Sequence, residues 1–401
     1  MFNKPLKNYR VIDLTNVLSG PFCCHQLAHL GADVIKIEIP GSGDLARQLG
    51  ADPDLNKKGM GVSFLAQNAG KKSITINLKT TKGREIFLAL VRTADVLVEN
   101  FRPGVMAALG LGFDDLKLEN ASLVYCAISG FGSNGPLRNL PAYDQIIQGM
   151  AGVMSITGDK ETAPFRVGYP IADTIGGMTA AFAIAAVLAG RKGKTLEPVF
   201  IDVSMLESTM ATMGWVVSNY LVAGQSPSPM GNENFTASPS GTFKTGDGLL
   251  NIAANKQEHF EDVCCVIGLP ELIADPRFSE RHSRLLNRME LKILIEDALA
   301  SKPAGEWERL LNATDVPAGR VLTVPEALDH PHIRSRGLIS TFENVPDIGK
   351  VEIVRTGFKL NGLTPEVQDP PPRLGQHTDQ ILCDLGFCPQ EIESLRKEGI
   401  I

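Results

Sequence analysis

Residues 9–38, YRVIDLTNVLSGPFCCHQLAHLGADVIKIE, contain two short apolar segments with a helical segment between them. Residues 9–14 and 32–38 are rich in Val and Ile, which predicts strands, and residues 21–30 predict a helix. A strand, a helix and a second strand in this short length form a βαβ unit, whose strands run parallel. The chain is therefore expected to begin with a parallel sheet.

The same alternation continues to about residue 130. Residues 71–78, 95–99 and 123–128 predict further extended segments, and residues 81–93 predict a helix that opens on a threonine cap. Strands that alternate with helices indicate the α/β class with a doubly wound sheet. Such sheets bind ligands at the carboxyl ends of their strands.

The rest of the chain has a different composition and a different order of predicted elements. Residues 173–190 are rich in Gly and Ala and predict a helix, and a second helical segment runs from 203 to about 223. Residues 224–240 are rich in Ser and Pro and predict a linker. A strand at 248–253 and amphipathic helices to about 311 then indicate a second, smaller α+β unit.

The composition excludes several classes of protein. A length of 401 residues suggests two or three domains, and a net charge of −6 without a charged block excludes broad binding to nucleic acid or anionic membrane. The seven cysteines form no CxxC motif, so neither a disulfide framework nor a zinc ribbon is indicated. The apolar run 178–190 is shorter than the ~20 residues of a bilayer span, and no apolar signal core begins the chain. We expect a cytoplasmic protein.

Two short motifs carry little weight. Residues 41–46, GSGDLA, match the GxGxxA dinucleotide fingerprint, but Pro40 precedes them and the sequence after them makes a poor helix. His25 and His29 have the i, i+4 spacing of zinc proteases, but Gln26 stands where the general base would be. A buried helix with two hydrogen-bonded imidazoles is favoured, and no metal site is expected.

Basic residues near the predicted strand ends are candidates for binding an anion. Lys71, Lys72, Lys79 and Arg102 could clamp an anionic cofactor there. A solvated basic face is an equally good interpretation.

Asp173 is the most informative single position, since it opens an otherwise uncharged helical segment. As an N-cap it would contribute ~1 kcal/mol to stability. As a nucleophile it would be an ionised carboxylate, favoured by the helix dipole, and Gly176 and Gly177 would let a substrate approach closely. Spacing alone favours the cap.

Taken together, these segments resemble one family. They are VIDLTNVLSGPFCCHQLAHLGADVIKIEIPGSGD (11–44), GKKSITINLK (70–79), ADVLVENFRPGVMAALGLGFDDL (94–116), ISGFGSNGP (128–136), PAYD (141–144), IADTIGGM (171–178) and LGQHTDQIL (374–382). In order and spacing they resemble the class III, or CaiB/BaiF-type, coenzyme A transferases. That family includes formyl-CoA transferase, carnitine CoA-transferase and α-methylacyl-CoA racemase.

The resemblance implies a fold and an assembly. Residues 1–200 and 330–401 would form a large Rossmann-like domain that binds CoA and is built from both chain ends. Residues 201–224 would form a linker helix, and residues 225–329 a small α+β domain. Two subunits would interlock like links of a chain, giving a homodimer.

It also implies a mechanism in which Asp173 is the nucleophile. Its carboxylate would attack an acyl-CoA, with succinyl-CoA as the expected donor, to give a mixed anhydride and then an aspartyl-CoA thioester. A small carboxylic acid would accept the CoA. Acyl-CoA is then a substrate, and no tightly bound cofactor is expected. The CoA contacts would be Val17, Leu18, Ser19, Lys72, Ile76, Asn77, Lys79, Asn100, Phe101, Arg102, Tyr143 and Asp144.

Several positions depart from the family pattern. Leu18 replaces a glutamine of formyl-CoA transferase, and Ile39 and Ala108 replace basic residues. The tetraglycine loop of that enzyme is absent from residues 224–245, which argues against the formyl/oxalyl pair of substrates.

The racemase branch has a histidine and a glutamate where this chain has Tyr143 and Lys256, which argues against two-base racemisation. Two alternatives to the transferase remain open, a 2-methylacyl-CoA racemase or epimerase and a CoA-binding protein without turnover.

Overall fold

The computed structural model describes residues 4–191 and 197–401, which form two compact units. The larger unit contains the described residues of 1–153, 166–223 and 332–401, so both ends of the chain contribute to it. The smaller unit contains residues 154–165 and 224–331.

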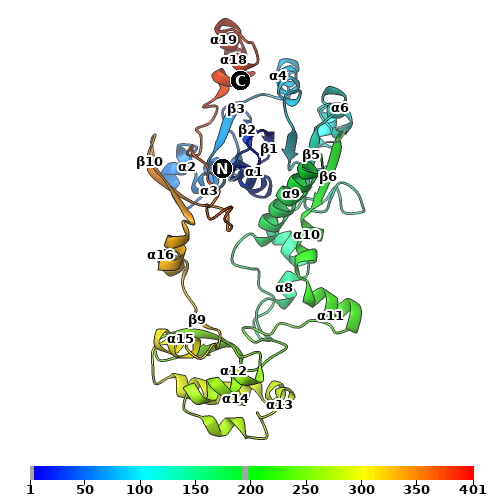
Figure 1. The fold of residues 1–401 in the computed structure, drawn as a ribbon. Helices are drawn as coiled ribbons and strands as arrows, with labels where there is room; N and C mark the ends of the chain where they lie inside the picture. Colours follow the sequence, from blue (N-terminus) through cyan, green and yellow to red (C-terminus); the bar gives the residue numbers. More distant parts are fainter. Residues whose placement is uncertain (1–3, 192–196) are drawn as a thin grey trace. The chain divides into compact units, whose positions relative to one another are not determined.

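The large unit is built on a six-stranded parallel sheet (Figure 1). Its strands are β1 (Arg10–Leu14), β2 (Asp33–Glu38), β3 (Lys71–Thr75), β4 (Val96–Glu99), β5 (Val124–Ser129) and β6 (Val199–Ser204). They lie in the order β3-β2-β1-β4-β5-β6, with every neighbouring pair parallel. This is the strand order of a Rossmann-type sheet. Because the order reverses between β1 and β4, the loops that follow these two strands leave in opposite directions and open a crevice.

Alternate residues of the central strands supply two apolar cores. Val11 and Val96 face a core that contains helices α1 (Ser19–His29) and α9 (Ile171–Gly190). Ile12 and Leu97 face the opposite core. That second core contains helices α4 (Thr81–Val91), α6 (Phe113–Glu119), α18 (Thr378–Asp384) and α19 (Pro389–Lys397). Burial on both faces explains why the strands read as nearly continuous Val and Ile runs.

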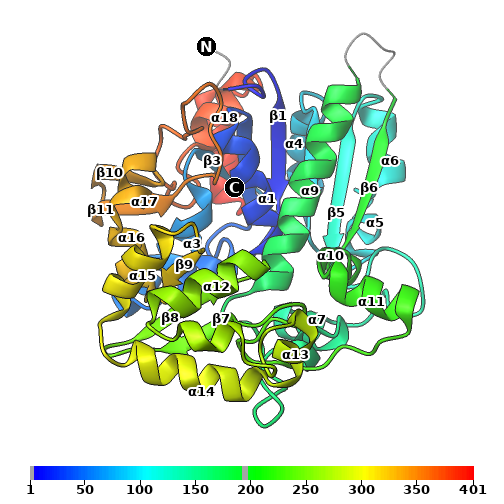
Figure 2. The ribbon, with the colours of Figure 1, turned by 60° about the horizontal axis from the view of Figure 1, so that its bottom comes forward.

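Helix α9 is the central helix of one face. By length and composition alone, its 20 residues would suffice to cross a membrane. The apolar run 178–190 considered in the sequence is only the later part of this helix. In the structure α9 packs against α1, α10 (Met205–Thr212), β5 and β6 (Figure 2). These contacts place one side of α9 in a core of the large unit.

Two glycines allow this packing. A Cβ atom at Gly177 would lie 2.3 Å from the carbonyl oxygen of Ser19, and one at Gly176 would lie 2.9 Å from Cγ of Met205. Both glycines are buried against protein atoms. The expectation that they admit a substrate is therefore wrong; they let α9 approach α1 and α10.

The smaller unit has a three-stranded antiparallel sheet beside helices. Its strands β7 (Ser240–Lys244), β8 (Leu249–Ala253) and β9 (Ala318–Arg320) lie in that order. Its main helices are α12 (Gln257–Val266), α13 (Arg281–Leu286), α14 (Arg288–Leu299) and α15 (Ala304–Asn312). The predicted strand at 248–253 and the helices that follow it are confirmed.

The structure corrects the prediction for residues 201–224. They begin as the end of β6 and continue as two helices, α10 and α11 (Trp215–Ala223), rather than as one linker helix. The helices are separated at Gly214, whose φ of +46° interrupts a right-handed helix.

The remaining elements are short. An antiparallel hairpin of β10 (Ile339–Val345) and β11 (Gly349–Val354) was not predicted. The other helices are η1 (Leu45–Gln48), α2 (Pro53–Lys57), α3 (Val62–Asn68), α5 (Val105–Ala108), α7 (Asp144–Met150), α8 (Val153–Ile156), η2 (Pro270–Ile273), α16 (Val324–Asp329) and α17 (Pro331–Arg336).

Candidate active site

A cavity of about 290 Å³ opens at the carboxyl ends of β1 and β4, and we call it the Asp173 cavity. Its walls are residues 16–19 after β1, 100–103 after β4, 128–131 at the end of β5, and 140–143 before α7. Asp173 reaches it from the first turn of α9. The cavity thus occupies the crevice where the strand order reverses, which is the ligand site of doubly wound sheets.

The structure brings most of the predicted site residues to this one cavity. Those that line it are Val17, Leu18, Ser19, Asn100, Phe101, Arg102, Tyr143 and Asp173. They come from segments up to 156 positions apart in sequence (173 less 17), and only the sheet topology unites them.

Five of the predicted CoA contacts do not line the cavity. One of them, Asp144, binds the backbone at the start of α9 instead, and the other four lie elsewhere. Lys72 donates to Asp33 at 2.7 Å, near the amino ends of the strands and away from the cavity edge. Ile76 is 2% exposed and packs in the core. Asn77 and the exposed Lys79 follow the carboxyl end of β3, outside the residues that line the cavity.

Lys71 is not available to clamp an anion. Its ammonium is fully buried, 2.8 Å from the carboxylate of Asp13 and 2.9 Å from the carbonyl oxygen of Pro21. The interpretation of Lys71 as an exposed basic residue is therefore wrong.

Asp173 does not cap its helix. Helix α9 begins at Ile171, and Pro170 occupies its N-cap position. The backbone N–H groups of the first turn have no acceptor within the helix, and two of them donate to Asp144. Oδ1 of Asp144 accepts the N–H of Ala172 at 2.8 Å and that of Asp173 at 3.4 Å. The N-cap interpretation of Asp173 is wrong because a buried carboxylate from α7 supplies the cap, which leaves the Asp173 side chain free to line the cavity.

The surroundings of Asp173 favour its protonated form. Burial, and then the charge of Asp144, raise the pKa of Asp173 to about 7. This corrects the expectation that the helix start favours ionisation, since desolvation and a like charge outweigh the dipole here. A carboxyl with a pKa near neutrality in a cavity is a common feature of catalytic sites.

Gln148 holds Asp144 in place. It is fully buried, donates to Oδ2 of Asp144 at 2.7 Å and accepts the N–H of Val167 at 2.8 Å. It therefore ties α7 to the segment that precedes α9. Gln148 was not predicted from the sequence, although its i, i+4 spacing from Asp144 was a usable signal.

The two loops of the crevice are tied to each other. Oδ1 of Asn100 accepts the N–H of Asn16 at 2.8 Å, and its Nδ2 donates to the carbonyl oxygen of Asn16 at 2.8 Å. The amide of Asn100 thus binds the loop after β1, so its first role is to fix the wall of the cavity.

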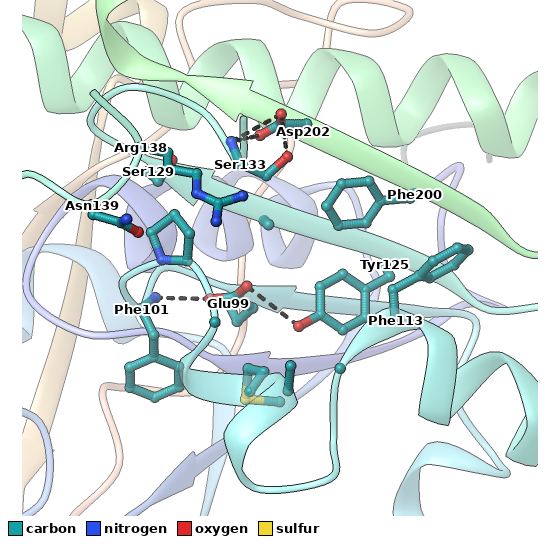
Figure 3. A pocket seen from close by; sticks show the side chains of 16 residues that line it. Glu99, Phe101, Phe113, Tyr125, Ser129, Ser133, Arg138, Asn139, Phe200 and Asp202 are labelled. Carbon is teal, nitrogen blue, oxygen red and sulfur yellow. Dashed lines mark hydrogen bonds between the residues drawn. The ribbon is translucent and has the colours of Figure 1, made fainter. Parts of the chain in front are cut away.

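A second pocket of about 270 Å³ lies beside the first, over β4, β5 and β6 (Figure 3). There the buried carboxyl of Glu99 accepts the hydroxyl of Tyr125 at 3.3 Å and the N–H of Phe101 at 2.8 Å. Burial raises the pKa of Glu99 to about 7. Arg138 lines both this pocket and the Asp173 cavity, and neither it nor Glu99 was singled out from the sequence.

The two weak motifs are structural. His25 and His29 lie on α1 with their Nε2 atoms 3.1 Å apart, and Nδ1 of His25 is 3.2 Å from the carbonyl oxygen of Ala69. Burial lowers the pKa of His29 to about 4 and that of His25 well below its ordinary value. Residues 41–46, the other motif, form a turn that runs into the four-residue 3₁₀ helix η1. A bound pyrophosphate needs the N-terminus of a long helix, which this segment does not provide. Within residues 4–191 and 197–401, no group of three or more His, Cys, Asp or Glu could hold a metal ion.

Comparisons with known proteins identify the family of the chain. Residues 6–378 match the family described as CoA-transferase family III. Mouse succinyl-CoA:glutarate CoA-transferase is 35% identical, over 99% of this chain and 90% of its own. Acetyl-CoA:oxalate CoA-transferase of Acetobacter aceti is 41% identical, over 84% of this chain and 85% of its own. The crystal structure of a CaiB/BaiF family protein from Brucella suis superposes with a TM-score of 0.83 and 32% identity, covering 96% of this chain and 100% of that one. The chain therefore belongs to CoA-transferase family III.

Proposed function

We propose that the protein moves CoA from an acyl-CoA, with succinyl-CoA as the expected donor, to a small dicarboxylic acid, with Asp173 as the nucleophile. One observation carries this proposal: Asp173 shares a single cavity with the loops that resemble the CoA-binding segments of the family. The cavity lies at the reversal point of the sheet, where a ligand of this kind is expected.

The reaction proceeds by exchange of acyl groups on one carboxylate. The ionised oxygen of Asp173 attacks the thioester carbonyl, a C–O bond forms, the C–S bond breaks, and CoA leaves as a thiolate. The thiolate then attacks the Asp173 carbonyl of the mixed anhydride, which releases the donor acid and leaves an aspartyl-CoA thioester. The acceptor carboxylate repeats the two steps in reverse order, so the new acyl-CoA leaves and Asp173 is regenerated.

The walls of the cavity suit the two ends of CoA. Among its described lining residues the cationic side chains are Arg102 and Arg138, which can pair with phosphate groups. Leu18, Phe101 and Tyr143 give apolar surface for the pantetheine arm. Asn77 and Lys79, at the carboxyl end of β3, are proposed to contact the nucleotide end, while the pairing of Lys72 with Asp33 leaves it no part in this proposal.

The names of the relatives support one class of acceptor acid for this protein. The mouse relative is named for succinyl-CoA and glutarate, and the Acetobacter relative for acetyl-CoA and oxalate. Both acceptors are small dicarboxylates, which supports that class for this chain. The missing tetraglycine loop does not remove oxalate as an acceptor, because a 41% identical relative carries that name.

We also propose that the protein works as an interlocked homodimer. Helix α11 leaves Trp215, Tyr220, Leu221 and Val222 exposed, and α9 leaves Phe182 exposed. Apolar side chains gathered on a helix in this way are typical of surfaces that a partner covers. Sedimentation analysis should give twice the chain mass; a monomer at micromolar concentration would contradict the assembly but not the chemistry.

The test of the chemistry is to trap the adduct. Mixing the protein with succinyl-CoA and no acceptor, then quenching and digesting, should yield a peptide that contains Asp173 and carries CoA, and hydroxylamine should remove it. The same experiment with Asp173→Asn is the control. An adduct on another residue, or exchange that survives Asp173→Asn, would contradict the proposed mechanism.

A further inference from the structure

Val17 holds a backbone conformation that its side chain disfavours. Its φ of +66° lies in the left-handed region, where a β-branched residue is a true outlier. Such strain persists only when surrounding groups impose it, and it is found most often at functional sites. Val17 lines the Asp173 cavity, so the cause of its conformation bears on the site.

The side chain of Asp44 binds the backbone of Val17. Oδ1 of Asp44 accepts the N–H of Val17 at 2.9 Å and that of Ala46 at 2.9 Å, while Oδ2 lies 3.0 Å from Nζ of Lys36. The side chains of Asp44 and Lys36 are both buried. A charged acceptor in a low-dielectric interior binds an N–H group strongly and directionally.

Lys36 extends the same support to Thr15. Its Nζ donates to the carbonyl oxygen of Thr15 at 2.7 Å, and lies 4.0 Å from Asp13. Asp13 accepts the N–H of Thr15 at 3.0 Å and pairs with Lys71 at 2.8 Å. Burial alone would lower the pKa of Lys36, but the charges of Asp13 and Asp44 outweigh it and raise that pKa.

Three consecutive residues at the start of this loop are therefore fixed by other groups of the protein. Thr15 is held by Asp13 and Lys36, Asn16 by Asn100, and Val17 by Asp44. These contacts are within the protein and exist before any substrate binds.

We propose that Asp44 is a positioning residue that holds Val17 in its left-handed conformation and so shapes the wall of the Asp173 cavity for the pantetheine arm of CoA. That the group bound against this wall is the pantetheine arm of CoA rests on the function proposed above. The sequence motif at residues 41–46 thus has a role that is unrelated to dinucleotides: its aspartate fixes the loop across the crevice. Preorganised walls of this kind lower the cost of aligning a substrate for attack.

The decisive experiment compares Asp44→Ala in two backgrounds. In the wild type it frees Val17 to relax, and kcat/KM for succinyl-CoA should fall about tenfold or more. In a Val17→Gly background the same substitution should cost several-fold less, because glycine adopts the left-handed conformation without help. Equal losses in the two backgrounds would overturn the proposal.

A second readout does not depend on turnover. Hydrogen exchange of a peptide that covers residues 14–19 should speed up in Asp44→Ala and change less in Asp44→Asn, which keeps an acceptor oxygen. Unchanged exchange in Asp44→Ala would overturn the proposal even if activity fell. Should Asp44→Ala not fold, Asp44→Asn decides by the comparison between backgrounds alone: its smaller loss of kcat/KM should shrink further in the Val17→Gly background, and equal losses in the two backgrounds would overturn the proposal.

Asp95→Asn is the matched control. Oδ2 of Asp95 accepts the N–H of Arg10 at 2.8 Å, at the amino ends of the strands and away from the cavity. This variant should leave KM and the exchange of residues 14–19 unchanged. Wild-type protein that neither binds nor exchanges CoA would defeat the proposed function, whereas the exchange experiment would still test the link between Asp44 and Val17.

Discussion

The carboxylate of Asp144 binds the backbone at Asp173 while its charge opposes ionisation of the Asp173 side chain. It accepts the N–H of Ala172 at 2.8 Å and that of Asp173 at 3.4 Å, which fixes the start of α9 at the edge of the cavity. Burial and this neighbouring charge together raise the pKa of Asp173 to about 7. One residue therefore both fixes the start of the helix that carries the proposed nucleophile and adds to the effect of burial on the pKa of its carboxyl.

The first prediction is a pH profile. A nucleophilic carboxylate must be ionised, and a pKa of about 7 means that exchange should rise as the pH rises through 7. Between pH 6 and pH 8 the ionised fraction increases about tenfold, and kcat/KM for the acyl-CoA should follow it. A flat profile over this range would show that the ionisation of Asp173 does not limit the reaction.

Removing the opposing charge should shift that profile. In Asp144→Asn the burial of Asp173 remains but the like charge is gone, so the pKa of Asp173 should fall and the profile should move to lower pH. The ratio of kcat/KM at pH 6 to that at pH 8 should increase. Asp114→Asn, at an exposed position on α6, is the control that should leave the ratio unchanged.

Asp173 should lower the stability of the protein at high pH. Its folded-state pKa of about 7 exceeds the ordinary value of 3.8, so the folded chain holds the proton more tightly than the unfolded chain. Stability is then lost as the pH rises from about 4 to about 7, and the deficit persists above 7. Asp173→Asn removes that deficit, so it should abolish exchange and raise the free energy of unfolding at pH 8 by about 1–4 kcal/mol. Denaturant titrations at pH 4.5 and pH 8 measure the difference; an equal gain at both pH values would contradict this origin.

The elements that can be predicted from the sequence are those whose hydrophobic pattern is visible within one short segment. The predicted helix at 21–30 corresponds to α1 at Ser19–His29, because its apolar positions and the flanking strands are visible in one short segment. Strand β6 was missed because Asp202 interrupts its short apolar run and half of its first four residues are exposed, and the predicted helix that follows was extended back into it. The hairpin of β10 and β11 was missed because its exposed positions alternate with only a few buried ones.

The site was predictable as a list of residues but not as an arrangement. Nothing near Asp173 in the sequence indicates that Asp144, 29 positions earlier, caps its helix. The bond from Asn16 to Asn100 spans 84 positions, and that from Val17 to Asp44 spans 27. These two contacts follow from the strand order, which places the loop after β1 next to the loops after β2 and β4. The alternation of strands and helices does not fix that order.

The close approach of α9 to α1 gives a prediction about packing. At Gly177 an added Cβ would lie 2.3 Å from the backbone oxygen of Ser19, which cannot move without shifting the cavity loop. Gly177→Ala should therefore lower both the melting temperature and kcat/KM, with a destabilisation of about 1–3 kcal/mol. At Gly190, on the same helix, no heavy atom of residues 4–191 and 197–401 outside the adjacent residues and helix backbone lies within 4 Å of an added Cβ. Gly190→Ala should be neutral or slightly stabilising, since alanine favours helix by up to about 1 kcal/mol.

The basic wall of the cavity gives the last prediction. Arg102 lies in the turn after β4, remote in the chain from Asp173, and the resemblance to the family assigns it to the phosphate end of CoA. Neutralising it in Arg102→Gln removes a charge-assisted contact, so KM for succinyl-CoA should rise about tenfold while kcat changes little.

The effect should shrink as salt increases, because partly exposed charges are screened. Arg92→Gln is the matched control: Arg92 is an exposed arginine that pairs with Glu119 on the surface at 2.6 Å and should leave KM unchanged. A fall in kcat with KM unchanged would instead place Arg102 beside the reacting carbonyl rather than at the phosphate end of CoA.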